Sequence, residues 1–165
     1  MATATLHLDV ASARFRSTNA AATVKANGTT VPVLGIAFDA AADEEAHFSF
    51  RISNYGSGNV FVRIAWYADT AASGNVVFGV ALGAITSGDP TNIETKALGT
   101  EATTAVAAES VAQAMSHITI QITSIDSIAD GDFVFVRLRR LGTNGSDTMA
   151  GDAIVVALEL NYSDT

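Results

Sequence analysis

The chain has 165 residues and a net charge of −8, from 17 Asp and Glu against 9 Lys and Arg, and it contains no cysteine. This length predicts one domain around one core, and the acidic balance argues against a general nucleic-acid binder. The missing cysteines exclude disulfides, thiolate metal sites and cysteine nucleophiles. The first residues do not resemble a secretory signal, and no apolar run reaches the roughly 18 residues that span a membrane.

Side chains alternate between apolar and polar types in many short runs, which is the period of a half-buried β-strand. In chain order, the apolar members of these runs are Leu6, Leu8, Val10; Phe48, Phe50, Ile52; Val60, Val62, Ile64, Trp66; Val76, Phe78, Val80, Leu82; Ile118, Ile120, Ile122; Val134, Val136, Leu138; and Ile154, Val156, Leu158, Leu160, Tyr162. Each run would present one apolar face to a core. Within these faces we expect Trp66, Phe78, Val156 and Leu158 to be core residues.

Turn-forming residues separate the runs. They include Asn27-Gly28, Ser73-Gly74-Asn75, Asp130-Gly131 and Asn144-Gly145, which tolerate positive φ angles. Seven or eight short strands with this spacing predict an all-β fold, a two-sheet antiparallel sandwich of jelly-roll type. The Ala-rich stretch 101–115 has no helical stripe, so an extended connection or edge strand is expected there.

Residues 1–30 differ from the rest of the chain, because they contain small residues, few aromatics and a positive balance of charge. Residues 1–38 carry Arg14, Arg16 and Lys25 against Asp9, a balance of +2, whereas residues 83–165 carry 4 basic and 11 acidic residues. We therefore divide the chain into an N-terminal arm or extra edge strand, residues 1–30, and a β-sandwich domain, residues 31–165.

No catalytic or metal-binding pattern is evident. His7 and His117 occupy polar strand positions, and no histidine lies in a nucleophile or zinc motif. The carboxylates Asp126, Asp130 and Asp132 do not have the spacing of a calcium loop, and a tight turn explains them better. The run 43–45 of acidic residues is expected to be a solvated loop. We expect no enzyme, no metal and no cofactor.

One strand shows apolar residues on both of its faces. Phe133 and Phe135 share a face with Arg137 and Arg139, opposite Val134, Val136 and Leu138. The face with the two phenylalanines needs a cover, either a second layer of the same chain or a neighbouring subunit. If strand 132–141 pairs with strand 152–162, Glu159 and Asp152 could form ion pairs with the arginines. A phosphate or acidic-glycan site is the alternative.

Two blocks of the sequence resemble a known family. Residues 50–85 include Val-Arg-Ile-Ala-Trp-Tyr-Ala-Asp-Thr and Gly-Asn-Val-Val-Phe-Gly. Residues 127–162 include Ala-Asp-Gly-Asp-Phe-Val-Phe-Val-Arg-Leu-Arg-Arg and then Asp-Thr and Gly-Asp-Ala. The combination is similar to jelly-roll domains of tailed-bacteriophage virions, found in capsid decoration (cement) proteins and in tail fibres and tailspikes.

The resemblance implies a structural role in a virion. It implies a homotrimer on the phage head surface that binds the major capsid protein and is made in the host cytoplasm, without nucleic-acid or membrane partners. It also implies that Arg140, Asp147 and Asp152 form a polar clasp in the final hairpin. On this interpretation Phe133, Phe135, Arg137 and Arg139 are a subunit interface, and Arg14, Arg16 and Lys25 contact the capsid. The alternative is a tail-fibre, receptor-binding or carbohydrate-binding β-sandwich.

Overall fold

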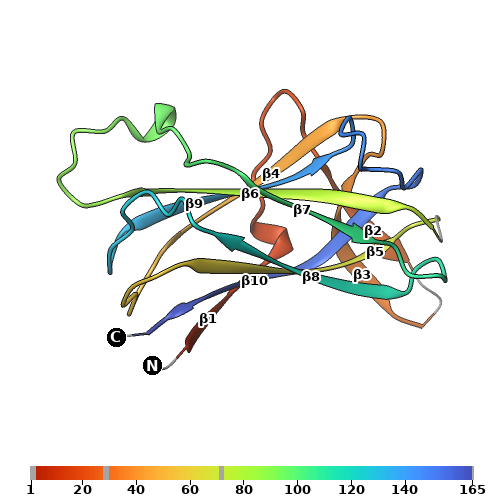
Figure 1. The fold of residues 1–165 in the computed structure, drawn as a ribbon, viewed down its shortest axis with the longest axis horizontal. Helices are drawn as coiled ribbons and strands as arrows, with labels where there is room; N and C mark the ends of the chain where they lie inside the picture. Colours follow the sequence, from red (N-terminus) through yellow and green to blue (C-terminus); the bar gives the residue numbers. More distant parts are fainter. Residues whose placement is uncertain (1–2, 28–29, 71–72, 165) are drawn as a thin grey trace.

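The computed structural model describes residues 3–27, 30–70 and 73–164, which form two antiparallel sheets packed face to face (Figure 1). Sheet A contains β1 (Thr3–Leu8), β2 (Ala22–Asn27), β3 (Pro32–Phe38), β5 (Val60–Ala68), β8 (Met115–Ile122) and β10 (Ala153–Ser163). Sheet B contains β4 (Asp43–Arg51), β6 (Asn75–Ile85), β7 (Ala102–Ala107) and β9 (Phe133–Leu141). The predicted two-sheet antiparallel sandwich is confirmed.

The strand order brings distant parts of the chain together. Sheet A runs β2-β3-β10-β5-β8, with β1 also paired to β10, and sheet B runs β4-β9-β6-β7. Two short 3-10 helices, η1 (Val10–Ser12) and η2 (Ile93–Thr95), complete the regular structure of the described residues. No helix within this part of the chain is long and apolar enough to cross a bilayer.

The core fills the space between the two sheets. The predicted inner faces of β5 and β6 are fully buried, and the Trp66 and Phe78 rings meet edge to face with centroids 5.6 Å apart, a favoured aromatic geometry. Leu158 is also buried. These positions match the alternation read from the sequence, because one face of each strand packs against the opposite sheet.

Val156 is the predicted core residue that does not reach this core. A register shift between Val155 and Ala157 marks a β-bulge where β10 pairs with β5. The bulge inserts one residue and exchanges the faces of the strand on either side of it. Val155 therefore points into the main core, whereas Val156 is half-buried in a small cluster with Ile154 and Tyr67 on the outer face of sheet A.

Three features of the N-terminal half escape the alternation rule. β2 is short of apolar residues and β3 is almost continuously apolar, so neither shows a clear period of two. β4 begins at Asp43, so the acidic run expected to be a solvated loop is its first segment, and Glu45 is only 5% exposed. The chain ends and the Asn27-Gly28 turn lie outside, or partly outside, the described residues.

Residues 3–27 form part of the β-sandwich. β1 and β2 add to sheet A, while Leu8, Val10 and Ala21 are buried in the main core. The 101–115 stretch contains β7, which is an edge strand of sheet B. An edge strand was one of the two structures expected there, the other being an extended connection.

Strand 132–141 does not pair with strand 152–162, the arrangement on which the suggested ion pairs with Asp152 and Glu159 depended. β9 lies between β4 and β6 in sheet B, whereas β10 belongs to sheet A. The two strands are consecutive in sequence, but the connection between them crosses from one sheet to the other. Asp152 and Glu159 therefore form no ion pair with Arg137 or Arg139, whose partners are Glu45, Glu101 and Asp43.

Arg140 continues the inward face of β9 and is completely buried. Its Nε and Nη2 donate to the two carboxylate oxygens of Asp147, at 3.1 and 2.8 Å. The remaining donors reach main-chain carbonyls of Phe38, Met149 and Gly151. All five guanidinium N–H groups are thus used, which is what a buried charge requires.

Asp147 and Asp152 differ in their relation to this arginine. Asp147 is nearly as buried as Arg140, and its Oδ2 also accepts a hydrogen bond from the Val77 amide. Asp152 is not a direct partner, because the five donors of Arg140 are occupied. Burial and the neighbouring carboxylates Asp39 and Asp69 raise the pKa of Asp152, despite the opposing charge of Arg140.

Replacing Arg140 by Leu should lower the free energy of unfolding by about 3–5 kcal/mol, because Asp147 would keep a buried charge without its partner. Arg63→Leu is the matched control, since Arg63 is half-exposed and lies 3.9 Å from Glu159; it should cost less than about 1 kcal/mol. Urea denaturation of both variants measures the difference. Equal losses would refute the special role of Arg140.

Asp152→Asn should stabilise the protein near neutral pH. A carboxyl group whose folded-state pKa lies above its ordinary 3.8 contributes stability at low pH and loses it as pH rises through the folded-state pKa. Thermal melts near pH 7 should show a higher Tm for the variant, and melts near pH 3 should show no gain. A lower Tm at both values would contradict this electrostatic interpretation.

Candidate functional site

The outer face of sheet B is partly covered by residues 86–101, the connection that contains η2 (green in Figure 1). Two glycines of β6 lie beneath it. A Cβ at Gly83 would lie 2.9 Å from Leu98 Cδ2, and one at Gly79 would lie 2.7 Å from Glu101 Cδ. The missing side chains allow the connection to approach the sheet, so the cover predicted for this face comes in part from the same chain.

Three contacts hold this connection in place. The Gly99 amide donates to Leu82 O at 2.8 Å, and the Thr100 amide donates to Ser124 Oγ at 3.0 Å. Lys96 Nζ lies 2.7 Å from Asp126 Oδ2, which also accepts from the Ala84 amide. The outer wall of the site is therefore anchored to β6 and to the connection between β8 and β9.

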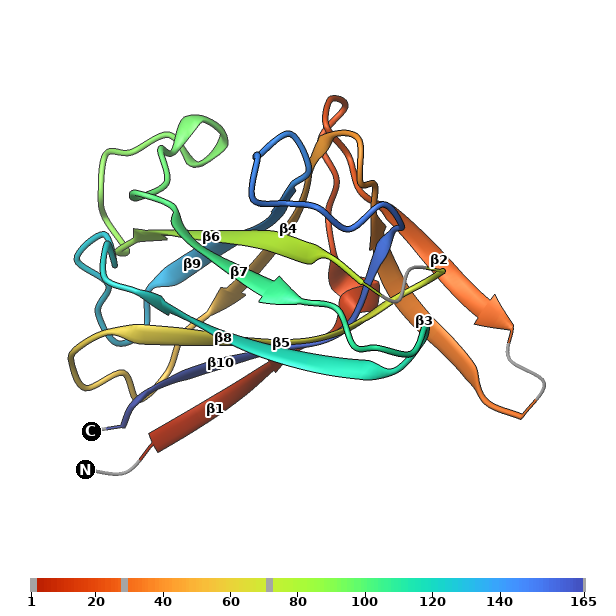
Figure 2. The same cartoon turned by 45° about the vertical axis from the view of Figure 1, so that its right-hand side comes forward.

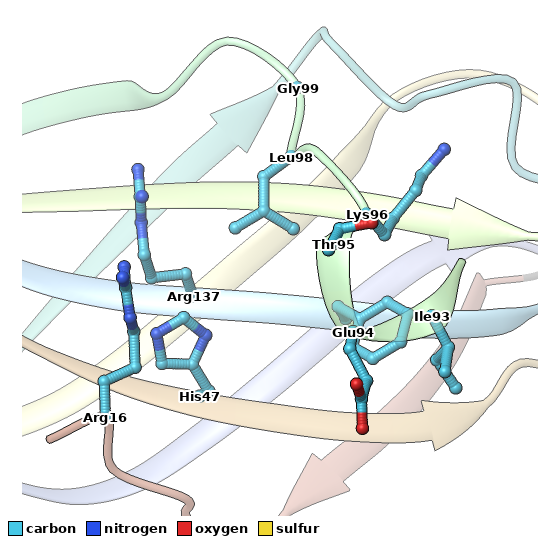
Figure 3. Close-up of a pocket in the computed structure, with 10 residues that line it drawn as sticks. Arg16, His47, Ile93, Glu94, Thr95, Lys96, Leu98, Gly99 and Arg137 are labelled. Carbon is cyan, nitrogen blue, oxygen red and sulfur yellow. The ribbon is translucent and has the colours of Figure 1, made fainter. Parts of the chain in front are cut away.

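An open groove of about 560 Å³ lies between this connection and strands β4 and β9. One side carries Arg16, His47 and Arg137, and the other carries the η2 segment and Leu98, as Figure 3 shows. We call this hollow the sheet B groove. It is lined by Arg16, His47, Ile93, Glu94, Thr95, Lys96, Leu98, Gly99, Phe135 and Arg137.

Glu45 is the buried centre of the charged wall. Its Oε1 lies 3.2 Å from Arg16 Nη1 and 3.2 Å from His47 Nε2, and its Oε2 lies 3.9 Å from Arg137 Nε. Burial favours the neutral acid, but the close contact with His47 and the charges of Arg137 and Arg16 outweigh it and hold the pKa of Glu45 below its ordinary value. Glu45 therefore stays ionised.

A chain of alternating charges continues along the sheet. Glu101 accepts from Arg137 Nη2 at 3.0 Å and from Arg139 Nη1 at 3.2 Å. Arg139 Nη2 donates to Asp43 at 2.9 Å. Burial opposes ionisation of Asp43, but its hydrogen bonds from Thr143 and the charge of Arg139 leave its pKa below the ordinary value. Mutual pairing fixes these side chains before any ligand arrives.

The structure separates the predicted interface residues into two groups. Phe135 and Arg137 line the sheet B groove, while Phe133 lies beyond it, 37% exposed and edge to face with Phe135. Arg137 and Arg139 form cross-strand ion pairs, but their partners are Glu101, Asp43 and Glu45 and not Asp152 or Glu159.

The three basic residues expected to contact the capsid, Arg14, Arg16 and Lys25, also lie in different parts of the structure. Arg14 exchanges main-chain hydrogen bonds with His47, both 2.8 Å long, which places the neighbouring Arg16 in the groove. Lys25 lies on β2 in the other sheet. Across residues 3–27, 30–70 and 73–164, the acidic and histidine side chains form no cluster of three that could hold a metal ion.

Sequence reasoning missed His47 and the wall 93–99. Their positions depend on long-range contacts, so no local pattern marks them. Gly79 and Gly83 inside a strand were an available signal, since an interior glycine often marks the close approach of another segment.

No protein-family model and no curated protein sequence matches the chain. Solved structures with a similar fold include carbohydrate-binding modules. CBM35 from Cellvibrio japonicus Abf62 aligns at 13% identity over 98% of this chain and 99% of its own, with a TM-score of 0.53. CBM6cm-2 from Cellvibrio mixtus lichenase 5A, in complex with cellotriose, aligns at 11% identity over 97% of each chain, with a TM-score of 0.51.

A third similar structure is the CBM22-1 xylan-binding domain from Paenibacillus barcinonensis Xyn10C, at 10% identity over 95% of this chain and 89% of its own, with a TM-score of 0.53. At these identities the likeness concerns the fold, and it supports the expected jelly-roll type of sandwich. Nothing in the matches is specific to phage virions.

Glu45→Gln should weaken the protein at neutral pH by roughly 1 kcal/mol and flatten its acid sensitivity. A carboxyl group with a lowered folded-state pKa adds stability above its ordinary pKa, here 4.5, and loses it as pH falls through the folded-state value. Urea denaturation between about pH 7 and pH 3 should show the flatter profile for this variant only. Glu109→Gln, at an exposed position, is the control, and identical profiles would exclude Glu45 as a source of acid sensitivity.

Proposed function

We propose that this chain is a non-catalytic carbohydrate-binding module that holds a glycan in the sheet B groove. The observation that carries the proposal is the groove itself, in which arginine side chains held by ion pairs lie beside the ring of Phe135. Of the two functions expected from the sequence, this is the alternative, and the fold shared with carbohydrate-binding modules supports it.

The lining suits the chemistry of a sugar. Guanidinium groups of Arg16 and Arg137 offer several N–H donors to hydroxyl oxygens, and Glu94 offers carboxylate acceptors. Phe135, Ile93 and Leu98 supply an apolar surface for the C–H face of a sugar ring.

The charged groups are poorly suited to glycoside hydrolysis. A glycosidase needs a carboxylic acid whose pKa is raised, so that it can protonate the leaving oxygen, and a second carboxylate across the scissile bond. Glu45 has the opposite property, since surrounding cations lower its pKa, and its side chain is only 6% exposed. Binding without turnover is the function that this arrangement favours.

Isothermal titration with xylo-oligosaccharides, cello-oligosaccharides and acidic oligogalacturonides tests the proposal. These probes are chosen because modules of similar fold were solved with cellotriose or are named as xylan-binding. Phe135→Ala and Arg137→Gln should each weaken binding at the sheet B groove by at least about tenfold.

Met115→Ala is the control, because Met115 is 46% exposed on β8 of the opposite sheet and should leave this affinity unchanged. Binding that survives both groove substitutions would move the glycan site elsewhere, and no binding of any probe would count against the function.

The phage-decoration role stays a separate prediction. It requires a stable homotrimer, which light scattering on the purified chain would detect, and it requires attachment to capsids. A monomer that binds glycans would favour the module, whereas a trimer that binds purified phage heads would favour decoration.

A further inference from the structure

We propose a second ligand site, on the outer face of sheet A, that takes a neutral oligosaccharide against Phe61, Asn59 and Asn161. The inference extends the proposed function to the opposite face of the sandwich, but it stands on its own geometry. We call this hollow the sheet A groove.

The sheet A groove lies where β1, β5 and β10 run side by side near the chain ends (Figure 2). Its volume is about 420 Å³, and the turn at residues 57–59 closes one side. Tyr55 donates its hydroxyl proton to Gly58 O, which fixes this turn. The site therefore rests on paired strands and a braced turn, which hold side chains more rigidly than a free loop does.

Phe61 gives the site an apolar platform. It is 38% exposed, whereas its neighbours Val60 and Val62 are fully buried. The strand register sets Phe61 between Asn161 of β10 and Gln121 of β8. An exposed ring between two amide side chains combines a stacking surface with hydrogen-bonding groups, as sugar recognition requires.

Some of the polar groups around the Phe61 ring already form hydrogen bonds within the protein, and others do not. Thr5 Oγ1 donates to Asn161 Oδ1 at 2.7 Å, so what Asn161 offers to a ligand is its amide N–H groups. Ser163, which also lines the groove, has a buried Oγ atom without a hydrogen-bond partner. Because that Oγ atom is buried, the polar groups open to a ligand are the amides of Asn161 and Asn59.

The absence of charge in this lining points to a neutral ligand. The side chains around the sheet A groove are hydroxyl, amide, apolar and phenolic, and the phenol of Tyr162 is engaged with Ser53 O at 2.9 Å. A carboxylate or phosphate ligand would find no cation among them. The sheet B groove, with its arginines and lysine, differs in this respect.

The same strand pair carries a second, smaller hollow farther along. It measures about 180 Å³ and is lined by Arg63, Ala65, His117, Ala157 and Glu159. In register, Arg63 of β5 lies opposite Glu159 of β10, two residues along from the pair of Phe61 and Asn161. This second hollow carries an arginine, a histidine and a carboxylate, so it is not part of the uncharged sheet A groove.

The test is isothermal titration of the full chain with neutral xylohexaose, cellohexaose and mannohexaose, at low and high salt. Phe61→Ala should remove one binding event, with at least a tenfold loss of affinity, and Phe61→Tyr should retain it. Asn161→Ala should weaken the same event. Because neither these ligands nor the lining carries a charge, this event should be insensitive to salt, whereas binding of an acidic oligogalacturonide in the sheet B groove should weaken as salt screens the charges.

The outcomes separate the two sites. If Phe61→Ala removes all binding and Phe135→Ala none, the sheet A site stands and the sheet B groove is excluded. If Phe61→Ala, folded with an unchanged melting temperature, binds every hexasaccharide like the wild type, the sheet A site is overturned while the sheet B proposal stands. Failure of all neutral hexasaccharides to bind the wild type overturns the sheet A site as well.

Discussion

The ion pair of Arg140 with Asp147 is the constraint on which much of this fold depends. It places a charge at the end of the inward face of β9, whose other residues Val134, Val136 and Leu138 are apolar. Such a charge persists only if every donor has a partner. Its partners come from the end of β3 and from the connection between β9 and β10. The pair therefore fixes the point at which the chain crosses from sheet B to sheet A.

That crossing decides which residues lie on the outer faces of the two sheets. Because β9 lies between β4 and β6, its outward phenylalanines and arginines meet Glu45 and His47 on one side and the glycines of β6 on the other. The glycines admit the 86–101 connection, and the connection makes the second wall of the sheet B groove. On the opposite sheet, the bulge at Val155 lets β10 turn Asn161 and Glu159 outward, beside Phe61 and Arg63.

The sequence anticipated much of the fold and only part of the candidate sites. The inner faces of β5 and β6 could be predicted, since a half-buried strand must alternate. β3 is buried over most of its length, so its residues are apolar without alternation. β2 is an edge strand and needs few apolar residues, so it does not alternate either. Phe135 and Arg137 were identified as unusual from the apolar second face of β9, but the sequence offered no means to find their neighbours.

By itself, the sequence determined the fold class, the core faces of most strands and the prevalence of ion pairs around the β9 arginines. These follow from the period of a strand and from the cost of leaving charge and apolar surface uncompensated. The tertiary structure alone decided strand order, the partners of each arginine and the position of both grooves. The reason is that pairing between distant strands depends on sheet crossings, bulges and close approaches, which local patterns do not record.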